Sequence, residues 1–220
     1  MNVLSVPKIF VDDFEQSFVS HQSNRQLLFV PPICGFIPLL RARISAVAAS
    51  LSEYFGRIRL VEFPGQNGRP GMFSVRNSAE ALTTLLQQET KAEFKLFGMC
   101  CGATACVTAS VQMPNVIGLI LWEMTPRYVY DTRHRLFYER RFSISVCNHS
   151  YLSPLQPIDL VSQLNCDTTY ATAFPSRYCD DAGQIELLSR TARAKWRRVR
   201  GVTHLLEGDG QPSGIVDLFH

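Results

Sequence analysis

The segment with the clearest chemical potential, residues 96–103, has the sequence LFGMCCGA. An apolar run that ends in a G-x-C-x-G turn is typical of a strand that bends sharply into a helix and raises one side chain at the apex. The glycines have a steric reason, because the apex backbone is strained and its neighbours must approach other backbone closely. We therefore predict that Cys100 is a nucleophile at the end of a buried strand.

A thiol attacks as a thiolate, so Cys100 needs a base within hydrogen-bond reach. His204 is the best candidate, because it follows the last strand that the sequence predicts, residues 197–202, by two positions. The remaining histidines, which have no comparable position after a strand, are His21, His134, His149 and His220.

A carboxylate would orient such an imidazole, and two carboxylates are candidates. Glu123 directly follows an apolar run at 116–122, and Asp181, beside Asp180, follows a predicted strand at 168–174. Both also have structural interpretations, because Glu123 could pair with an arginine and either aspartate could cap the next helix. The sequence leaves both candidates open.

The order of the predicted elements indicates the fold class. Strands are expected at 25–30, 57–63, 94–97, 116–122, 168–174 and 197–202, and helices at 40–55, 75–89, 103–112, 182–194 and 214–219. This alternation predicts an α/β protein with a mostly parallel sheet, right-handed crossovers and helices on both faces. We expect one domain over residues 1–220, with an inserted, partly helical lid at about 127–165, where the alternation breaks.

Composition excludes several classes. Seven cysteines without paired spacing favour reduced thiols, and the spacing of zinc ligands is missing, so we expect no metal and no cofactor. The sequence has neither a basic start followed by an apolar run nor about 20 consecutive apolar residues. We therefore expect a soluble, cytoplasmic protein that is not bound to a membrane.

The formal net charge is only +3, but the basic residues are unevenly distributed. One set comprises Arg190, Arg193, Lys195, Arg197, Arg198 and Arg200, and a second comprises Arg127, Arg133, Arg135, Arg140 and Arg141. Such sets are either solvated faces or a docking surface for an acidic partner. No recognition motif accompanies them, so we expect no nucleic-acid binding.

Four segments together, residues 27–35, 62–66, 96–103 and 199–206, give the chain from about 25 to 219 a family resemblance. It resembles an α/β-hydrolase, and more narrowly the thioesterases of polyketide and nonribosomal peptide assembly lines. The resemblance implies an oxyanion hole formed by the backbone N–H groups of Ile33 and Cys101. The chain departs from this family by carrying Cys100 where Ser is common, and Glu123 where the assembly-line thioesterases keep Asp.

The resemblance implies a thioesterase-like enzyme that takes an acyl group from a carrier-protein or CoA thioester onto Cys100. Because a thioester on Cys100 stays activated, transfer to an amine, an alcohol or a thiol, including cyclisation, competes with hydrolysis. The expected partner is an acidic acyl carrier protein. One alternative is a small-molecule esterase or lactone hydrolase similar to dienelactone hydrolases, which carry Cys at this turn but lack the insertion. A third is a hydrolase-fold protein that binds a ligand without turnover.

Overall fold

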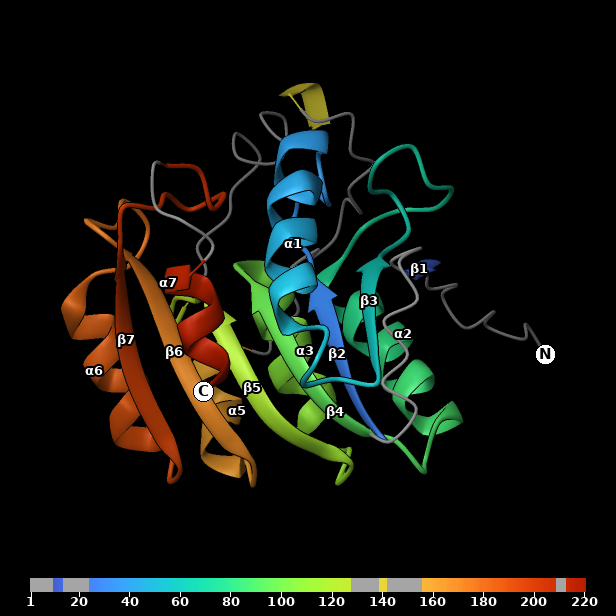
Figure 1. Ribbon diagram of the computed structural model, residues 1–220. Coiled ribbons are helices and arrows are strands. Elements are labelled where there is room, and N and C mark those ends of the chain that lie inside the picture. Colours follow the sequence, from blue (N-terminus) through green and yellow to red (C-terminus); the bar gives the residue numbers. More distant parts are fainter. Residues whose placement is uncertain (1–9, 14–23, 128–138, 142–155, 209–212) are drawn as a thin grey trace.

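A single sheet organises the computed structural model, which describes residues 10–13, 24–127, 139–141, 156–208 and 213–220 (Figure 1). Within these residues the sheet has seven strands in the order β1-β3-β2-β4-β5-β6-β7. The strands are β1 (Phe10–Asp13), β2 (Arg25–Val30), β3 (Arg57–Glu62), β4 (Glu93–Met99), β5 (Val116–Trp122), β6 (Asp167–Phe174) and β7 (Ala194–Arg200). Strands β2 to β7 run parallel, and only β1, which the sequence did not predict, is antiparallel to its neighbour.

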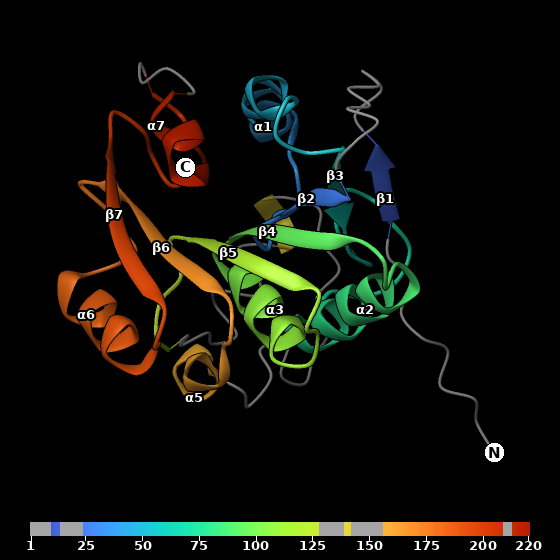
Figure 2. The same cartoon turned by 60° about the horizontal axis from the view of Figure 1, so that its bottom comes forward.

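Helices cover both faces of this sheet, as predicted. They are α1 (Pro38–Leu51), α2 (Val75–Gln88), α3 (Cys101–Ser110), α5 (Pro157–Leu160), α6 (Asp181–Arg190) and α7 (Ser213–Val216), with 3-10 turns η1 (Val161–Gln163) and η2 (Asp217–Phe219). Figure 2 shows α1 and α7 on one face, and α2, α3, α5 and α6 on the other. The predicted α/β class with a mostly parallel, doubly covered sheet is confirmed.

Alternation along the central strands divides the interior into two cores. In β4, Leu96 belongs to the core beneath α2 and α3, whereas Phe97 belongs to the core beneath α1 and α7. Strand β5 shows the same division, with Leu119 on the first side and Ile120 on the second. Burial on both faces explains why these strands are apolar runs, and it fixes which strand ends reach the candidate site.

Two local features agree closely with the sequence. Helix α1 buries the predicted stripe that includes Leu40, Ile44 and Leu51. Helix α2 begins after Ser74, whose hydroxyl accepts a hydrogen bond from the N–H of Asn77 at 3.0 Å. Apolar spacing and a side-chain cap therefore define these two helices well.

The carboxyl-terminal part differs more from the expected boundaries. Helix α6 ends at Arg190, and β7 begins at Ala194 instead of Arg197. The predicted terminal helix at 214–219 divides into α7 and η2. Among the described strands, β7 pairs with β6 alone and is largely exposed, so its polar residues give little apolar signal from which to predict its start.

Most of the predicted lid insertion lies outside the described residues, which omit 128–138 and 142–155. Its last part is described and belongs to the core, because α5 packs against α3 and α6. Ile158 and Val161 are buried there among residues of the α2 and α3 side. Among the described residues, no helix combines the length and the apolar character needed to cross a membrane.

Candidate active site

Cys100 forms the apex of a sharp bend between β4 and α3. Its backbone has φ +52° and ψ −120°, a conformation that residues other than glycine rarely adopt. The N–H of Cys100 donates to the carbonyl of Trp122 at 2.8 Å, which ties the bend to the end of β5. The predicted position of Cys100, at the carboxyl edge of the sheet, is therefore observed.

Close backbone approach explains both glycines of the bend. A Cβ on Gly102 would lie 2.1 Å from the carbonyl oxygen of Pro31, in the loop after β2. A Cβ on Gly98 would lie 2.6 Å from the Cα of Ala103. Both distances are far below van der Waals contact, so the two glycines let the loop after β2 and helix α3 pack directly against the bend.

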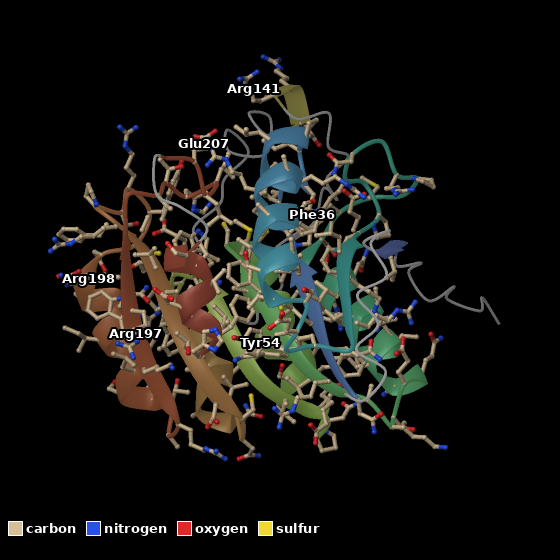
Figure 3. The ribbon with its side chains drawn as sticks, in the orientation of Figure 1. Phe36, Tyr54, Arg141, Arg197, Arg198 and Glu207 are labelled. Carbon is tan, nitrogen blue, oxygen red and sulfur yellow. The ribbon has the colours of Figure 1, made fainter. Side chains whose placement is uncertain are left out.

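His204 reaches the same edge from the loop after β7. Its carbonyl accepts a hydrogen bond from the indole N–H of Trp122 at 2.9 Å, which holds the loop over the end of β5. The imidazole is 16% exposed, and the ring of Tyr178 lies against it at a centroid distance of 4.3 Å. The carbonyl of Glu207 accepts a hydrogen bond from the N–H of Thr203 at 2.6 Å and closes this loop, in the upper part of Figure 3.

Glu123 supplies the carboxylate that contacts this imidazole. Its side chain is fully buried, and its Oε2 lies 3.3 Å from Nδ1 of His204. The same Oε2 accepts a hydrogen bond from the hydroxyl of Ser176 at 3.0 Å, and Oε1 accepts one from the N–H of Ala173 at 2.8 Å. These partners compensate a buried charge and hold the carboxylate against the ring.

The charge state of His204 follows from its neighbours. Burial, the largest influence, lowers the pKa of the imidazole because it penalises the charged ring. Side-chain hydrogen bonds with Cys100 and Glu123, and the negative charges of both, outweigh burial and raise the pKa from 6.5 to about 9. The side chains of Cys100 and Glu123 therefore stabilise the protonated form of the His204 imidazole.

The alternative carboxylate, Asp181, has a different partner. It is the first residue of α6, and its carboxylate forms a hydrogen-bonded ion pair with Arg198 of β7, with both side chains substantially exposed. Asp180 caps α6, because its Oδ1 accepts a hydrogen bond from the N–H of Gly183 at 2.7 Å. Of the two candidate carboxylates, the structure thus brings Glu123 into contact with His204, whereas Asp181 contacts Arg198.

The two backbone groups expected at the oxyanion hole flank the bend. Cys101 is the first residue of α3, where helix N–H groups point out of the helix end. Ile33 is buried in the loop after β2, which Gly102 allows to approach. Gln66 holds that loop in place, because its amide donates to the carbonyls of Pro32 at 2.9 Å and Ile33 at 3.1 Å.

Two further thiols lie near Cys100 and are poor nucleophiles. Burial, followed by the charge of Cys100, raises the pKa of Cys34 to about 12. Burial and a side-chain hydrogen bond with Cys100 raise the pKa of Cys101 well above its ordinary value. Of the thiols at the bend, Cys100 is therefore the one with a histidine partner.

Three positioning residues were not singled out from the sequence. Ser176 lies after β6 and gave no signal, because a lone serine behind a strand is common. Gln66 lies in the EFPGQ segment that carried the family resemblance, so its position was marked without its role. Trp122 was predicted only as the last residue of a buried strand, although its indole also holds the His204 loop.

The structure describes part of the two basic sets and the surroundings of the possible metal ligands. Within the described ranges, no group of three or more His, Cys, Asp or Glu side chains is placed to hold a metal ion. Arg127 pairs with Glu186 at 3.0 Å, and Arg193 with Asp167 at 2.7 Å, so part of the basic charge is locally compensated. Arg133 and Arg135 lie outside the described residues.

Solved structures share this architecture over almost the whole chain. A lipase-esterase related protein from Clostridium acetobutylicum has a TM-score of 0.70 at 12% identity, covering 96% of this chain and 98% of its own. A thioesterase domain from the curacin biosynthetic pathway has a TM-score of 0.70 at 13% identity, with coverages of 96% and 94%. A thermophilic esterase from Thermogutta terrifontis has a TM-score of 0.68 at 13% identity, with coverages of 96% and 91%. No protein-family model and no curated protein sequence matches the chain.

Proposed function

The chain has the α/β-hydrolase fold, and we propose that it is an acyl-transfer enzyme with a cysteine nucleophile. The observation that carries the proposal is the contact chain in which the Cys100 side chain hydrogen-bonds His204, whose Nδ1 lies 3.3 Å from the buried Glu123. A nucleophile, a base and an orienting carboxylate in this order can activate a thiol for attack on an acyl group.

In the first half-reaction, His204 takes the proton of the Cys100 thiol through Nε2, the nitrogen that Glu123 leaves free. The thiolate then attacks the carbonyl carbon of an acyl thioester, and the oxygen gains negative charge. Backbone N–H groups of Cys101 and Ile33 are the donors proposed to stabilise that oxygen. The bond between the acyl carbon and the leaving sulfur breaks, and His204 gives its proton to the leaving thiolate, which departs as a thiol.

In the second half-reaction, water or another nucleophile attacks the acyl carbon on Cys100. His204 removes the proton of the attacking group, and Cys100 leaves as a thiolate stabilised by the imidazolium. Exchange of one thioester for another is nearly level in free energy, so the acyl group on Cys100 remains activated. Transfer to an amine or a hydroxyl, including cyclisation, is therefore proposed alongside hydrolysis.

The proposed donor is an acyl carrier protein or CoA, in keeping with the resemblance to assembly-line thioesterases of secondary metabolism. Exposed basic side chains support an acidic donor, because Lys195, Arg197 and Arg200 lie along β7, the strand that leads to the His204 loop. Figure 3 shows Arg197 on this strand. A surface of one sign attracts an acidic partner and raises its local concentration.

The proposal is tested by comparing acyl groups offered as carrier-bound thioesters, as CoA thioesters and as free lactones. We expect the highest kcat/KM for the carrier-bound thioester, and a loss of this preference in Arg197→Glu but not in Arg76→Glu, an exposed arginine on α2. Preference for a free lactone would favour the alternative, a small-molecule esterase or lactone hydrolase.

The reactivity of the Cys100 thiol distinguishes the proposed enzyme from a protein that binds a ligand without turnover. We expect iodoacetamide to label Cys100 rapidly and stoichiometrically, and the rate to fall in His204→Ala. Labelling of Cys100 as slow as that of the other cysteines would favour the non-catalytic interpretation.

A further inference from the structure

A cavity of about 490 Å³ opens at the edge of the sheet opposite to Cys100. Its lining includes Arg25 and Asp167, the first residues of β2 and β6, and Lys95 near the start of β4. Lys95 lies in β4, five residues before Cys100 at the end of the same strand, and five residues of extended strand span about 16 Å. The cavity is therefore separate from the candidate active site.

The backbone of β5 creates room above Lys95. The pairing of β4 with β5 shifts register after Phe94, which pairs with Val116, so that Lys95 pairs with Gly118 and Ile117 is the extra residue. Gly118 has no side chain to fill the space, and a Cβ there would lie 3.5 Å from Cγ and Cε of Lys95. A bulge and a glycine thus leave the lysine side chain at the base of an open cavity.

The ammonium group of Lys95 is only partly satisfied by its surroundings. It donates to the carbonyl of Phe219 at 2.9 Å, although an ammonium has three donors. Within the described part of the chain, no carboxylate lies within ion-pair distance of it. Burial, then the positive charges of Lys195 and Arg25, lower the pKa of Lys95, while Asp167 opposes them.

Two acidic side chains at this edge of the sheet are already paired. Asp167 has a 2.7 Å ion pair with Arg193, and Glu93 has a 3.3 Å ion pair with Arg25. Lys95 and Lys195 are thus left as neighbouring positive charges that repel each other. An anion in the cavity would relieve this repulsion and use the remaining donors of Lys95.

Aromatic rings form the other walls. The Phe219 ring lies 5.5 Å from the ammonium of Lys95 and 6.2 Å from the ring of Phe55. Tyr54 packs against His220 at a centroid distance of 4.8 Å, and Figure 3 shows Tyr54 below α1 in front of the sheet. Flat apolar walls beside a small number of charged groups are typical of sites for small organic ligands, as is a volume of this size.

We propose that this cavity is a binding site for a small aromatic anion, whose carboxylate or phosphate pairs with Lys95 and whose ring packs against Phe219 and Tyr54. The site is separate from the Cys100 machinery and does not depend on the function proposed for it. The shared chemistry of the ligand is an anionic group on a flat apolar body.

Calorimetric titration with benzoate and phenyl phosphate tests this site and tells the two anionic groups apart. We expect saturable binding of at least one of them to the wild type, and binding at least tenfold weaker in Lys95→Met. Lys91→Met removes the same charge from an exposed position four residues away and should bind as the wild type does. Lys95→Arg keeps the charge and should retain binding, which guards against a folding defect in Lys95→Met.

Two further arms make the test specific. Benzyl alcohol, a neutral analogue, and inorganic phosphate, which has no ring, should each bind at least tenfold more weakly than the better aromatic anion. Saturating anion should leave iodoacetamide labelling of Cys100 unchanged. Equal affinity in the wild type and Lys95→Met, tight binding of benzyl alcohol, protection of Cys100, or no saturable binding up to about 10 mM would each overturn the proposal.

Discussion

At the carboxyl edge of the sheet, the buried carboxylate of Glu123 has donors on both oxygens and lies against the imidazole of His204. At the amino edge, the half-buried ammonium of Lys95 donates to one backbone carbonyl and faces other positive charges. The carboxyl edge therefore compensates its buried charge internally, whereas the Lys95 ammonium at the amino edge has no ion pair with a carboxylate of the described residues.

The backbone also differs between the two edges, being strained at the carboxyl edge and open at the amino edge. Cys100 and Glu123 at the carboxyl edge both have φ +52°, a costly conformation that fixes where their side chains point. At the amino edge, a register shift and Gly118 create space without placing a nucleophile. Strain with internal charge pairing suits proton transfer and covalent chemistry, and open space with unbalanced charge suits reversible binding.

The largest effect is expected from a substitution that removes the nucleophile at the carboxyl edge and leaves the amino edge intact. Cys100→Ala should lower kcat/KM for an acyl thioester by about 10⁴-fold or more, because the nucleophile is lost. The same variant should bind benzoate or phenyl phosphate as the wild type does. Steady-state kinetics and calorimetry on one preparation check both halves, and a joint loss would show that the edges are not independent.

The next largest effect is expected when the two candidate carboxylates at the carboxyl edge are replaced one at a time. Glu123→Gln should lower kcat by about 10²- to 10⁴-fold, because the uncharged amide no longer stabilises the imidazolium. Asp181→Asn removes a charge from an exposed ion pair and should change kcat by less than about twofold. Comparable losses of kcat in the two variants would contradict the assignment of Glu123.

The pH dependence of His204 is an intermediate effect with a definite sign. Its pKa is raised in the folded protein, from 6.5 to about 9, so it contributes stability that is fully present below pH 6.5 and is lost as pH rises through about 9. The difference in unfolding free energy between the wild type and His204→Ala should therefore shrink over this window. Denaturant unfolding measures it, and a difference that grows with pH would contradict the account.

The smallest effect concerns the support of Glu123. Ser176→Ala removes a donor to Glu123 and an acceptor for the N–H groups of Tyr178 and Cys179, so we expect a kcat about tenfold lower with little change in KM. Ser176→Thr should restore most of the kcat. Ser189→Ala, at an exposed position on α6, is the control, and a change in KM alone would argue against a positioning role for Ser176.

The sequence was informative where chemistry depends on local pattern. The bend around Cys100 was predictable because its steric requirements are met by two nearby glycines. The choice between Glu123 and Asp181 was not, because both follow parallel strands at the same edge. It depends on nonlocal partners, namely Ala173 and Ser176 for the first carboxylate and Arg198 for the second.

The cavity at the amino edge could not be predicted from the sequence. Lys95 reads as a polar interruption at the start of an apolar strand, and nothing nearby in the sequence shows that it lies opposite Gly118. Phe219 comes from the other end of the chain, 124 residues away. Only strand register and the return of the chain end to the sheet bring these groups together.

The central claim, that Cys100 carries the acyl group, is tested most directly by intact-protein mass spectrometry after brief exposure to an acyl thioester. The account predicts a wild-type adduct with the mass of one acyl group, mapped to Cys100 by peptide analysis. It predicts much slower adduct formation in His204→Ala and none in Cys100→Ala. An adduct that persists in Cys100→Ala, or that maps to another cysteine, would contradict it.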